Sequence, residues 1–165
     1  MIIAGTGHRP NKLGGYGDDV KIKLQKFAVS MINNLKVKPD RIISGMALGW
    51  DQALARAAVE LGIPFIAAVP FRGQEMAWPA SSQKEYAELL TLALKTIYVS
   101  EPGYYKQKMQ IRNAFMVNSC DIVLALWDGT PGGTKNCLDY ATYRAKKMVI
   151  NVWDEWRNYE SRLHQ

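Results

Sequence analysis

The 165-residue chain is 48% hydrophobic, which excludes a disordered protein and is enough for one domain with its own core. Its formal net charge of +6 is spread over several short basic segments, so a small anionic ligand is favoured over a nucleic acid. No apolar run reaches the roughly 18 residues of a membrane span, and the apolar stretch at the start, MIIAGTGHRP, is too short for a signal peptide. We therefore expect a cytoplasmic protein that does not contact a membrane.

Strand and helix patterns alternate along the whole chain. Apolar residues spaced four, three, four and four apart predict a helix over residues 18–36. Further helices are predicted at 50–61, 80–94, 105–118 and from the turn at 128–134 to Lys146. Strands are predicted at residues 1–5, 41–45, 64–69, 95–100, 121–127 and 148–153. Single helices between strands imply parallel pairing, so we expect an α/β fold, with a doubly wound, mostly parallel sheet and helices on both faces.

Five segments follow predicted strands, and three of them are rich in glycine: GTGHRP, SGMALGWD and WDGTPGGT. In open parallel sheets, ligands bind beyond the carboxyl ends of the strands. Glycine lets backbone N–H groups approach a phosphate closely. Pro10 replaces the third glycine of a dinucleotide fingerprint, and GGTK lacks the order of a P-loop. Neither an NAD oxidoreductase nor a P-loop NTPase is supported.

The cysteines and histidines do not form a metal-binding pattern. Cys120 and Cys137 lie in no metal-ligand spacing and are predicted to be buried thiols. His8 and His164 are the only histidines, which excludes a site with several histidine ligands. We expect neither a metal nor a cofactor.

Several of these motifs resemble the SLOG superfamily, and most closely its YpsA-like branch. The motifs fall in the family's order: GTGHRP, SGMALGWDQALARAA, PF with Gln74 and Trp78, RNAFMV, and WDG followed by GGT. The superfamily includes the LOG phosphoribohydrolases and DprA. The resemblance implies a Rossmann-like domain over residues 1–153. The tail at 154–165 could form one or two amphipathic turns, using Trp156, Tyr159 and Leu163. It also implies that the glycine-rich edge binds nucleotides or nucleotide-derived ligands.

The LOG enzymes cleave an N-glycosidic bond with an arginine and a glutamate, carried by RKxxM and PGGxGTxxE segments. RNAFM places Arg112 at the arginine and Asn113 at the lysine. Counted from Pro131, Asp139 takes the glutamate's place, whereas counted from Thr134 the place goes to Cys137. Arg112 and Asp139 are therefore the catalytic candidates if the chain is a hydrolase.

Five further side chains each have two interpretations. Arg9 could bind a phosphate or form a surface ion pair, and His8 could contact a ligand or hold its turn through a backbone carbonyl. Asp51 could accept hydrogen bonds from a ribose or cap a helix. Trp78 could stack on a base or anchor an interface, and Asp128 could contact the ligand or its own turn.

Together these arguments give a predicted ligand site and three functional hypotheses. The ligand-binding candidates are Gly5, Thr6, Gly7, His8, Arg9, Ser44, Gly45, Met46, Gly49, Asp51, Pro70, Phe71, Trp78, Arg112, Asn113, Asp128, Gly129, Gly132, Gly133 and Thr134. We expect a protein that binds a nucleotide-derived small molecule as a sensor, carrier or sequestering protein. The alternatives are a nucleoside-monophosphate N-glycosidase and, less favoured, a single-stranded DNA binder. Self-association into a homo-oligomer is also expected, because the tail carries Trp156 and Tyr159.

Overall fold

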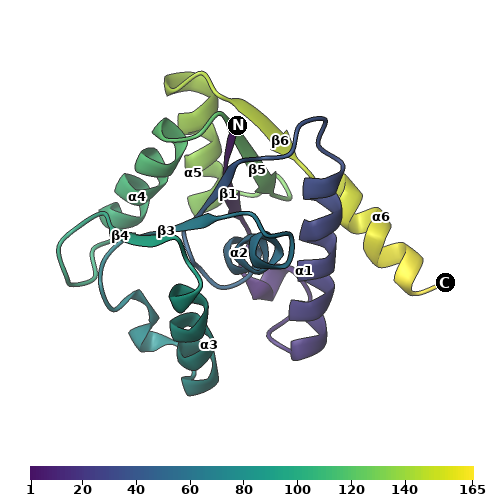
Figure 1. Cartoon of the computed structure of the whole chain (residues 1–165), viewed down its shortest axis with the longest axis horizontal. Helices are drawn as coiled ribbons and strands as arrows, with labels where there is room; N and C mark the ends of the chain where they lie inside the picture. The colour runs from purple at the N-terminus through teal and green to yellow at the C-terminus, as the bar shows by residue number, and fades with distance from the viewer.

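One six-stranded sheet runs through the centre of the molecule (Figure 1). The structure is a computed structural model that describes residues 1–165. The strands are all parallel and lie in the order β4-β3-β2-β1-β5-β6. Their bounds are β1 Ile2–Gly7, β2 Arg41–Ser44, β3 Phe65–Val69, β4 Lys95–Tyr98, β5 Ile122–Leu126 and β6 Met148–Asn151. The predicted parallel α/β fold is confirmed.

Side chains along the strands alternate between two hydrophobic cores, one on each face of the sheet. In β3, Phe65, Ala67 and Val69 join the larger core, whereas Ile66 and Ala68 join the smaller one. This alternation is the period of two that a strand imposes on its side chains. Because both faces are buried, the central strands read as nearly continuous apolar runs.

The helices divide between these two faces (Figure 1). The larger core is covered by α1 Asp18–Asn33, α2 Trp50–Glu60, α3 Ala80–Thr91 and α6 Trp153–Leu163. The smaller core is covered by α4 Lys106–Asn118 and α5 Gly133–Asp139, which continues as a π-helical turn over Tyr140–Arg144. Helix α2 is buried along most of its length, and its alanines let the sheet and α1 approach closely on either side.

The strand order reverses between β1 and β5. Strands β2, β3 and β4 follow one another on one side of β1, whereas β5 and β6 lie on its other side. The loops that leave β1 and β5 therefore diverge, which opens a crevice at the carboxyl ends of these strands. The position of the candidate site follows from this topology.

The element boundaries differ from the predictions mainly near chain turns. Helix α1 ends at Asn33, three residues before the predicted end, and β1 extends through Gly7. The last strand stops at Asn151, because Trp153 already begins α6.

No helix is long and apolar enough to span a membrane.

The tail forms α6, a helix of 11 residues that packs against α1 (Figure 1). Trp156 is completely buried, and its ring lies 5.1 Å from that of Phe27 in an edge-to-face arrangement. Tyr159 stacks on Trp156 and also contacts Phe27. The two aromatic residues expected to mark a self-association surface therefore pack within the chain's own core.

Candidate functional site

A polar cleft of about 460 Å³ lies at the reversal of strand order. Its walls come from the segment after β1, the start of α2, one face of α4 and the turn before α5. The volume falls within the usual range for small-molecule sites, and the position is the one that open parallel sheets use for ligands.

Arg112 of α4 lies at the floor of the cleft and is only 5% exposed. Its Nη1 donates to the carbonyl oxygen of Gly45 at 2.5 Å, and its Nε donates to Oδ1 of Asn113 at 2.9 Å. Its Nη2 donates to no protein atom and is available to a ligand. Burial lowers the pKa of Arg112 while the carboxylate of Asp51 opposes that shift, and the guanidinium remains charged.

Asp51 is the only carboxylate that lines the cleft. It lies in the first turn of α2, and its Oδ2 accepts one long hydrogen bond, from the backbone N–H of Ala47 at 3.4 Å. Burial raises the pKa of Asp51, and the charges of Arg112 and Arg9 only partly oppose that rise. A buried carboxylate with so few partners destabilises the fold and is typical of functional sites.

The rim of the cleft is basic. Arg9, Lys12 and Lys106 reach it from the segment after β1 and from the first turn of α4. With Arg112, four cations and one carboxylate therefore line the cleft. This excess of positive charge favours an anionic ligand.

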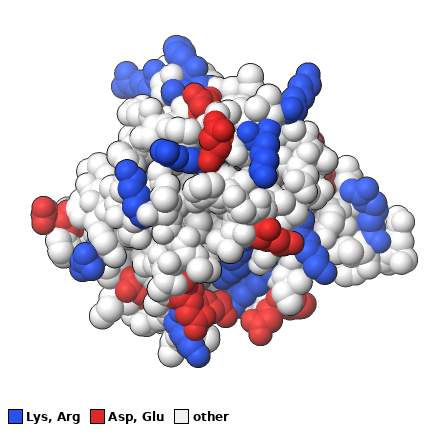
Figure 2. All heavy atoms as spheres, viewed as in Figure 1, with Lys and Arg blue, Asp and Glu red and all other residues white.

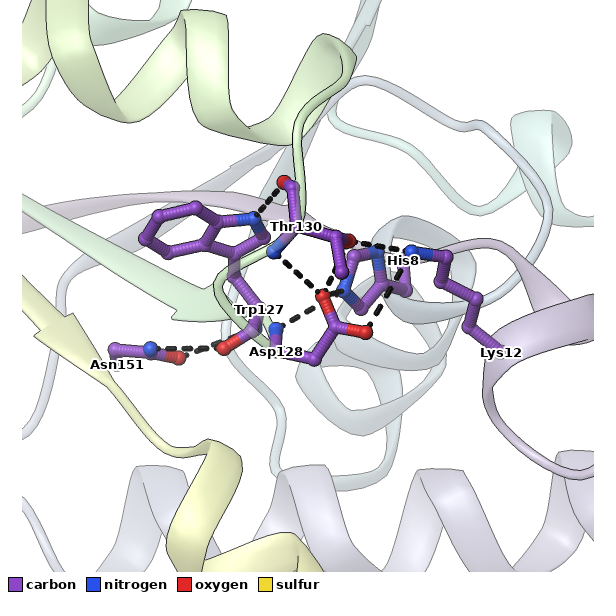
Figure 3. A network of polar contacts seen from close by, with 6 residues as sticks. All are labelled: His8, Lys12, Trp127, Asp128, Thr130 and Asn151. Carbon is purple, nitrogen blue, oxygen red and sulfur yellow. Dashed lines mark hydrogen bonds and ion pairs between the residues drawn. The ribbon is translucent and has the colours of Figure 1, made fainter.

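A hydrogen-bond network links the segments that leave β1 and β5 (Figure 3). His8 Nε2 lies 2.7 Å from Oδ1 of Asp128, and that oxygen also accepts from the backbone N–H of Thr130 at 3.0 Å. Lys12 contacts both Asp128 and the hydroxyl of Thr130. Burial alone would raise the pKa of Asp128, but the bonds from Thr130 and His8 hold it below its usual value. The side chain of His8 therefore contacts the turn after β5 through both the carboxylate and the backbone N–H of Asp128, and not through a backbone carbonyl. Asp128 in turn accepts a hydrogen bond within its own turn, from Thr130.

Trp127 and Asn151 anchor the same turn from behind (Figure 3). Trp127 Nε1 donates to the carbonyl oxygen of Thr130 at 2.7 Å. Asn151 exchanges two hydrogen bonds with the backbone of Trp127, at 2.9 and 3.1 Å. The turn between β5 and α5 is therefore fixed to β6 through Trp127.

The glycines of the two turns have different surroundings. A Cβ at Gly49 would lie 2.5 Å from the carbonyl oxygen of His8, and one at Gly45 would lie 2.8 Å from Oδ2 of Asp51. By contrast, Gly132 and Gly133 have no atom within 4 Å of that position. Gly45 and Gly49 thus bring protein groups together, whereas the turn before α5 leaves space for a ligand.

The structure brings half of the predicted ligand-binding residues into one cleft. Those that line it are Thr6, Gly7, His8, Arg9, Asp51, Arg112, Asn113, Gly132, Gly133 and Thr134. Gly5, Ser44, Gly45, Met46, Gly49, Pro70, Phe71, Trp78, Asp128 and Gly129 do not line it. Phe71 packs against Tyr104 and Trp78 against Tyr86, both edge to face. The hydroxyl of Ser44 instead holds the first turn of α2, through the carbonyl oxygen of Asp51 at 2.7 Å.

Nine residues that line the cleft are not among the predicted ligand-binding residues. These are Asn11, Lys12, Ala47, Lys106, Met109, Gln110, Thr130, Pro131 and Asn136. On α4, Lys106, Met109, Gln110 and Asn113 have the spacing of one helix face. This spacing could have identified Lys106, Met109 and Gln110 from the sequence, because it places them on the same helix face as the predicted Asn113.

Asp139 and Cys137, the two candidates for the LOG glutamate position, both lie outside the lining of the cleft. Asp139 forms an ion pair with Lys135 and is about half exposed. Cys137 is buried as a free thiol near Thr6 and Arg112, and burial raises its pKa to about 11. The prediction that both cysteines are buried thiols is confirmed.

The fold and the position of the cleft define a Rossmann-like α/β protein. The sequence matches the family YpsA, described as the YspA SLOG family, over residues 3–153. The chain belongs to this family, and the resemblance seen in its motifs is confirmed.

A relative from Bacillus subtilis (strain 168), the uncharacterized SPbeta prophage-derived protein YoqJ, is 34% identical over 138 residues. The match covers 73% of this chain and 81% of the relative. DprA from Streptococcus pneumoniae has a TM-score of 0.63 at 19% identity, covering 99% of this chain and 55% of that one. The molybdenum cofactor carrier protein from Chlamydomonas reinhardtii has a TM-score of 0.55 at 14% identity, and the match covers 98% of this chain and 83% of that one. This chain thus spans about half of the DprA structure, and these two likenesses support the fold alone.

Proposed function

We propose that this chain binds an anionic, nucleotide-derived small molecule in the cleft, as a sensor, carrier or sequestering protein. The proposal is supported by one observation: the floor of the cleft holds two buried charged side chains, Asp51 and Arg112, and the rim of the same cleft is basic. Buried charged groups with unused hydrogen-bonding capacity are unfavourable in a purely structural role. Ligand contacts would compensate for this cost.

The arrangement assigns different parts of such a ligand to different groups. Arg9, Lys12 and Lys106 would attract its phosphates, and the open turn at Gly132 and Gly133 would let them approach the backbone closely. Oδ1 of Asp51 has no hydrogen-bond partner in the protein and would accept from ribose hydroxyls. Asp51 does not cap α2, because the one hydrogen bond of its carboxylate comes from the backbone N–H of Ala47, which precedes the helix.

A thermal-shift screen of the purified chain tests the proposal. Nucleoside monophosphates, ADP-ribose derivatives and cyclic nucleotides would be added separately, and each mixture would then be separated by HPLC. We expect a rise in Tm with at least one of these compounds, with the compound recovered intact. No rise with any of them would refute the ligand class.

A matched pair of lysine variants locates the binding. Lys106→Ala removes a rim cation, whereas Lys84→Ala removes a lysine on α3 that is 79% exposed and lies outside the cleft. We expect Lys106→Ala to weaken binding roughly threefold to tenfold and to reduce its salt dependence, because one charge contact is lost. Lys84→Ala should behave like the unaltered chain.

Hydrolysis of an N-glycosidic bond is the second candidate, and the buried Asp51 beside Arg112 is the observation that favours it. A carboxyl group whose pKa is raised by burial suits general acid–base chemistry. Release of free base in the HPLC step would establish this reaction. Asp51→Asn should then abolish release, and Asp139→Asn should not, because Asp139 is paired with Lys135 outside the cleft.

Nucleic acid is the third candidate, since one structural neighbour is a DNA processing protein. Figure 2 shows basic side chains interspersed with acidic ones over the viewed face, without a continuous basic track. On this face, the distribution of charge favours a small ligand over a nucleic acid. Binding of single-stranded DNA with an affinity that falls steeply with salt would reverse that preference.

A further inference from the structure

The cleft has no ring on which a base could stack. No Phe, Tyr or Trp side chain lines it, and Ala47 and Met109 are its apolar side chains besides the proline of the turn. The imidazole of His8 is held by Asp128 and packs edge-on against Trp153. Nucleic-acid-binding proteins commonly hold bases by stacking them on aromatic side chains, and this cleft provides none.

The aromatic residues outside the lining are either held by other contacts or exposed to solvent. Trp78 packs on Tyr86, with ring centroids 5.3 Å apart. The indole N–H of Trp127 is bound to the carbonyl oxygen of Thr130. Tyr105, which directly precedes α4, is 65% exposed and does not line the cleft.

The floor of the cleft instead offers groups that suit a sugar. Three of its side-chain atoms have no hydrogen-bond partner in the protein: Oδ1 of Asp51, Nη2 of Arg112 and Nδ2 of Asn113. All three residues are more than nine-tenths buried and line the cleft. One acceptor beside two donors matches neighbouring hydroxyl groups, which both donate and accept.

Building on the proposed function, we infer that the cleft recognises a phosphorylated pentose and leaves the base in solvent. Asp51, Arg112 and Asn113 bind the sugar hydroxyls, while the basic rim binds the phosphate. The ligand class is ribose 5-phosphate and the larger molecules that carry it. Discrimination between bases is not a property of this site.

Isothermal titration of the full chain with ribose 5-phosphate, AMP and adenosine tests this inference. A base stacked on an aromatic ring would improve affinity roughly 5- to 150-fold. Without such a ring, we expect ribose 5-phosphate and AMP to bind within about threefold of each other. Adenosine should bind more than about a hundredfold more weakly, because it lacks the phosphate.

Two matched variants extend the test to single side chains. Asp51→Asn should weaken ribose 5-phosphate binding about tenfold or more, because a hydroxyl loses a charged acceptor. Asp139→Asn changes the same residue type outside the cleft and should have no effect. Tyr105→Ala should change the affinity for AMP by less than about twofold, because an exposed side chain outside the site contributes little.

The outcomes separate the two proposals. Binding of AMP more than about tenfold tighter than ribose 5-phosphate would overturn the inference but leave the proposed function standing. Selective loss of AMP binding in Tyr105→Ala would do the same, because the base would then contact that ring. If no phosphorylated compound binds, both fail.

Discussion

Two glycine-rich turns of this chain look alike in sequence and serve different purposes in the fold. The turn between β2 and α2 contains Gly45 and Gly49, and both glycines face other protein groups at close range. The turn between β5 and α5 contains Gly132 and Gly133, and both face open space in the cleft wall. A glycine therefore indicates that something approaches the backbone, but not whether it is protein or ligand.

The difference follows from what each turn must hold. The first turn positions the two buried charged residues at the floor: Arg112 donates to the carbonyl oxygen of Gly45, and Asp51 is the second residue of α2, which the turn leads into. The second turn is fixed by His8, Asp128 and Trp127, while the Cβ positions of Gly132 and Gly133 stay free of contacts. The turn after β2 therefore positions the residues at the floor of the cleft, and the turn after β5 forms part of its wall.

The largest effect should come from Gly49→Ala in the packed turn. Gly49 has a φ of +94°, and the added Cβ would lie 2.5 Å from the carbonyl oxygen of His8. We expect a loss of about 3 kcal/mol in the free energy of unfolding, because both backbone strain and a steric clash are introduced. Urea unfolding measures this loss, and a change under about 1 kcal/mol would refute the close packing of this turn.

Gly133→Val tests the open turn in the opposite way. Its Cβ position meets no atom within 4 Å, and its φ is not positive, so stability should change by no more than about 0.5 kcal/mol. The side chain would protrude into the cleft wall and should weaken ribose 5-phosphate binding about tenfold, or about 1.4 kcal/mol. Urea unfolding and titration calorimetry give the two values. Large destabilisation with unchanged binding would mean that the two turns do not differ as described.

Asp51→Asn should stabilise the chain while weakening ligand binding. Since burial raises the folded-state pKa of Asp51 above 3.8, ionisation of this group destabilises the fold as pH rises through that pKa. The variant avoids this loss, so its Tm should exceed the original by about 3 °C near neutral pH, and by less near pH 4. Calorimetry across this pH range measures the difference. An advantage that grows toward acid would contradict the assignment.

Asp128→Asn should have the smallest effect and the opposite pH dependence. The pKa of Asp128 is held below 3.8 by its partners, so its contribution to stability is complete above that pH and is lost on acidification. Because Asp128 is partly exposed, the loss in the variant should be about 1 kcal/mol or less at neutral pH. Thermal unfolding from about pH 3 to 7 should show the two chains converging toward the acid end.

The fold could be predicted because its signals are local and repeated. Each strand is a short apolar run, each helix has an apolar face, and their alternation leaves few arrangements of a parallel sheet. The end of α1 and the start of α6 were less predictable. They depend on tertiary packing, as the burial of Trp156 against Phe27 shows.

The site could be predicted only in part, because strand ends locate a cleft but do not show which way each side chain points. Thr6, Arg9 and Asp51 were found because they lie in the glycine-rich segments that leave the predicted strands. Trp78 follows a strand too, but its loop turns it toward Tyr86. The positive φ of Met46, a buried non-glycine residue, has no signal in the sequence.

Helix α6 shows that the end of a sequence match need not be the end of a folding unit. The family match stops at residue 153, whereas Trp156 fills part of the larger core. A chain shortened to residue 153 would expose the ring of Phe27, which Trp156 and Tyr159 cover. Exposed apolar surface of this kind promotes aggregation. For recombinant work on this protein, the last 12 residues belong with the rest, whatever the similarity to relatives suggests.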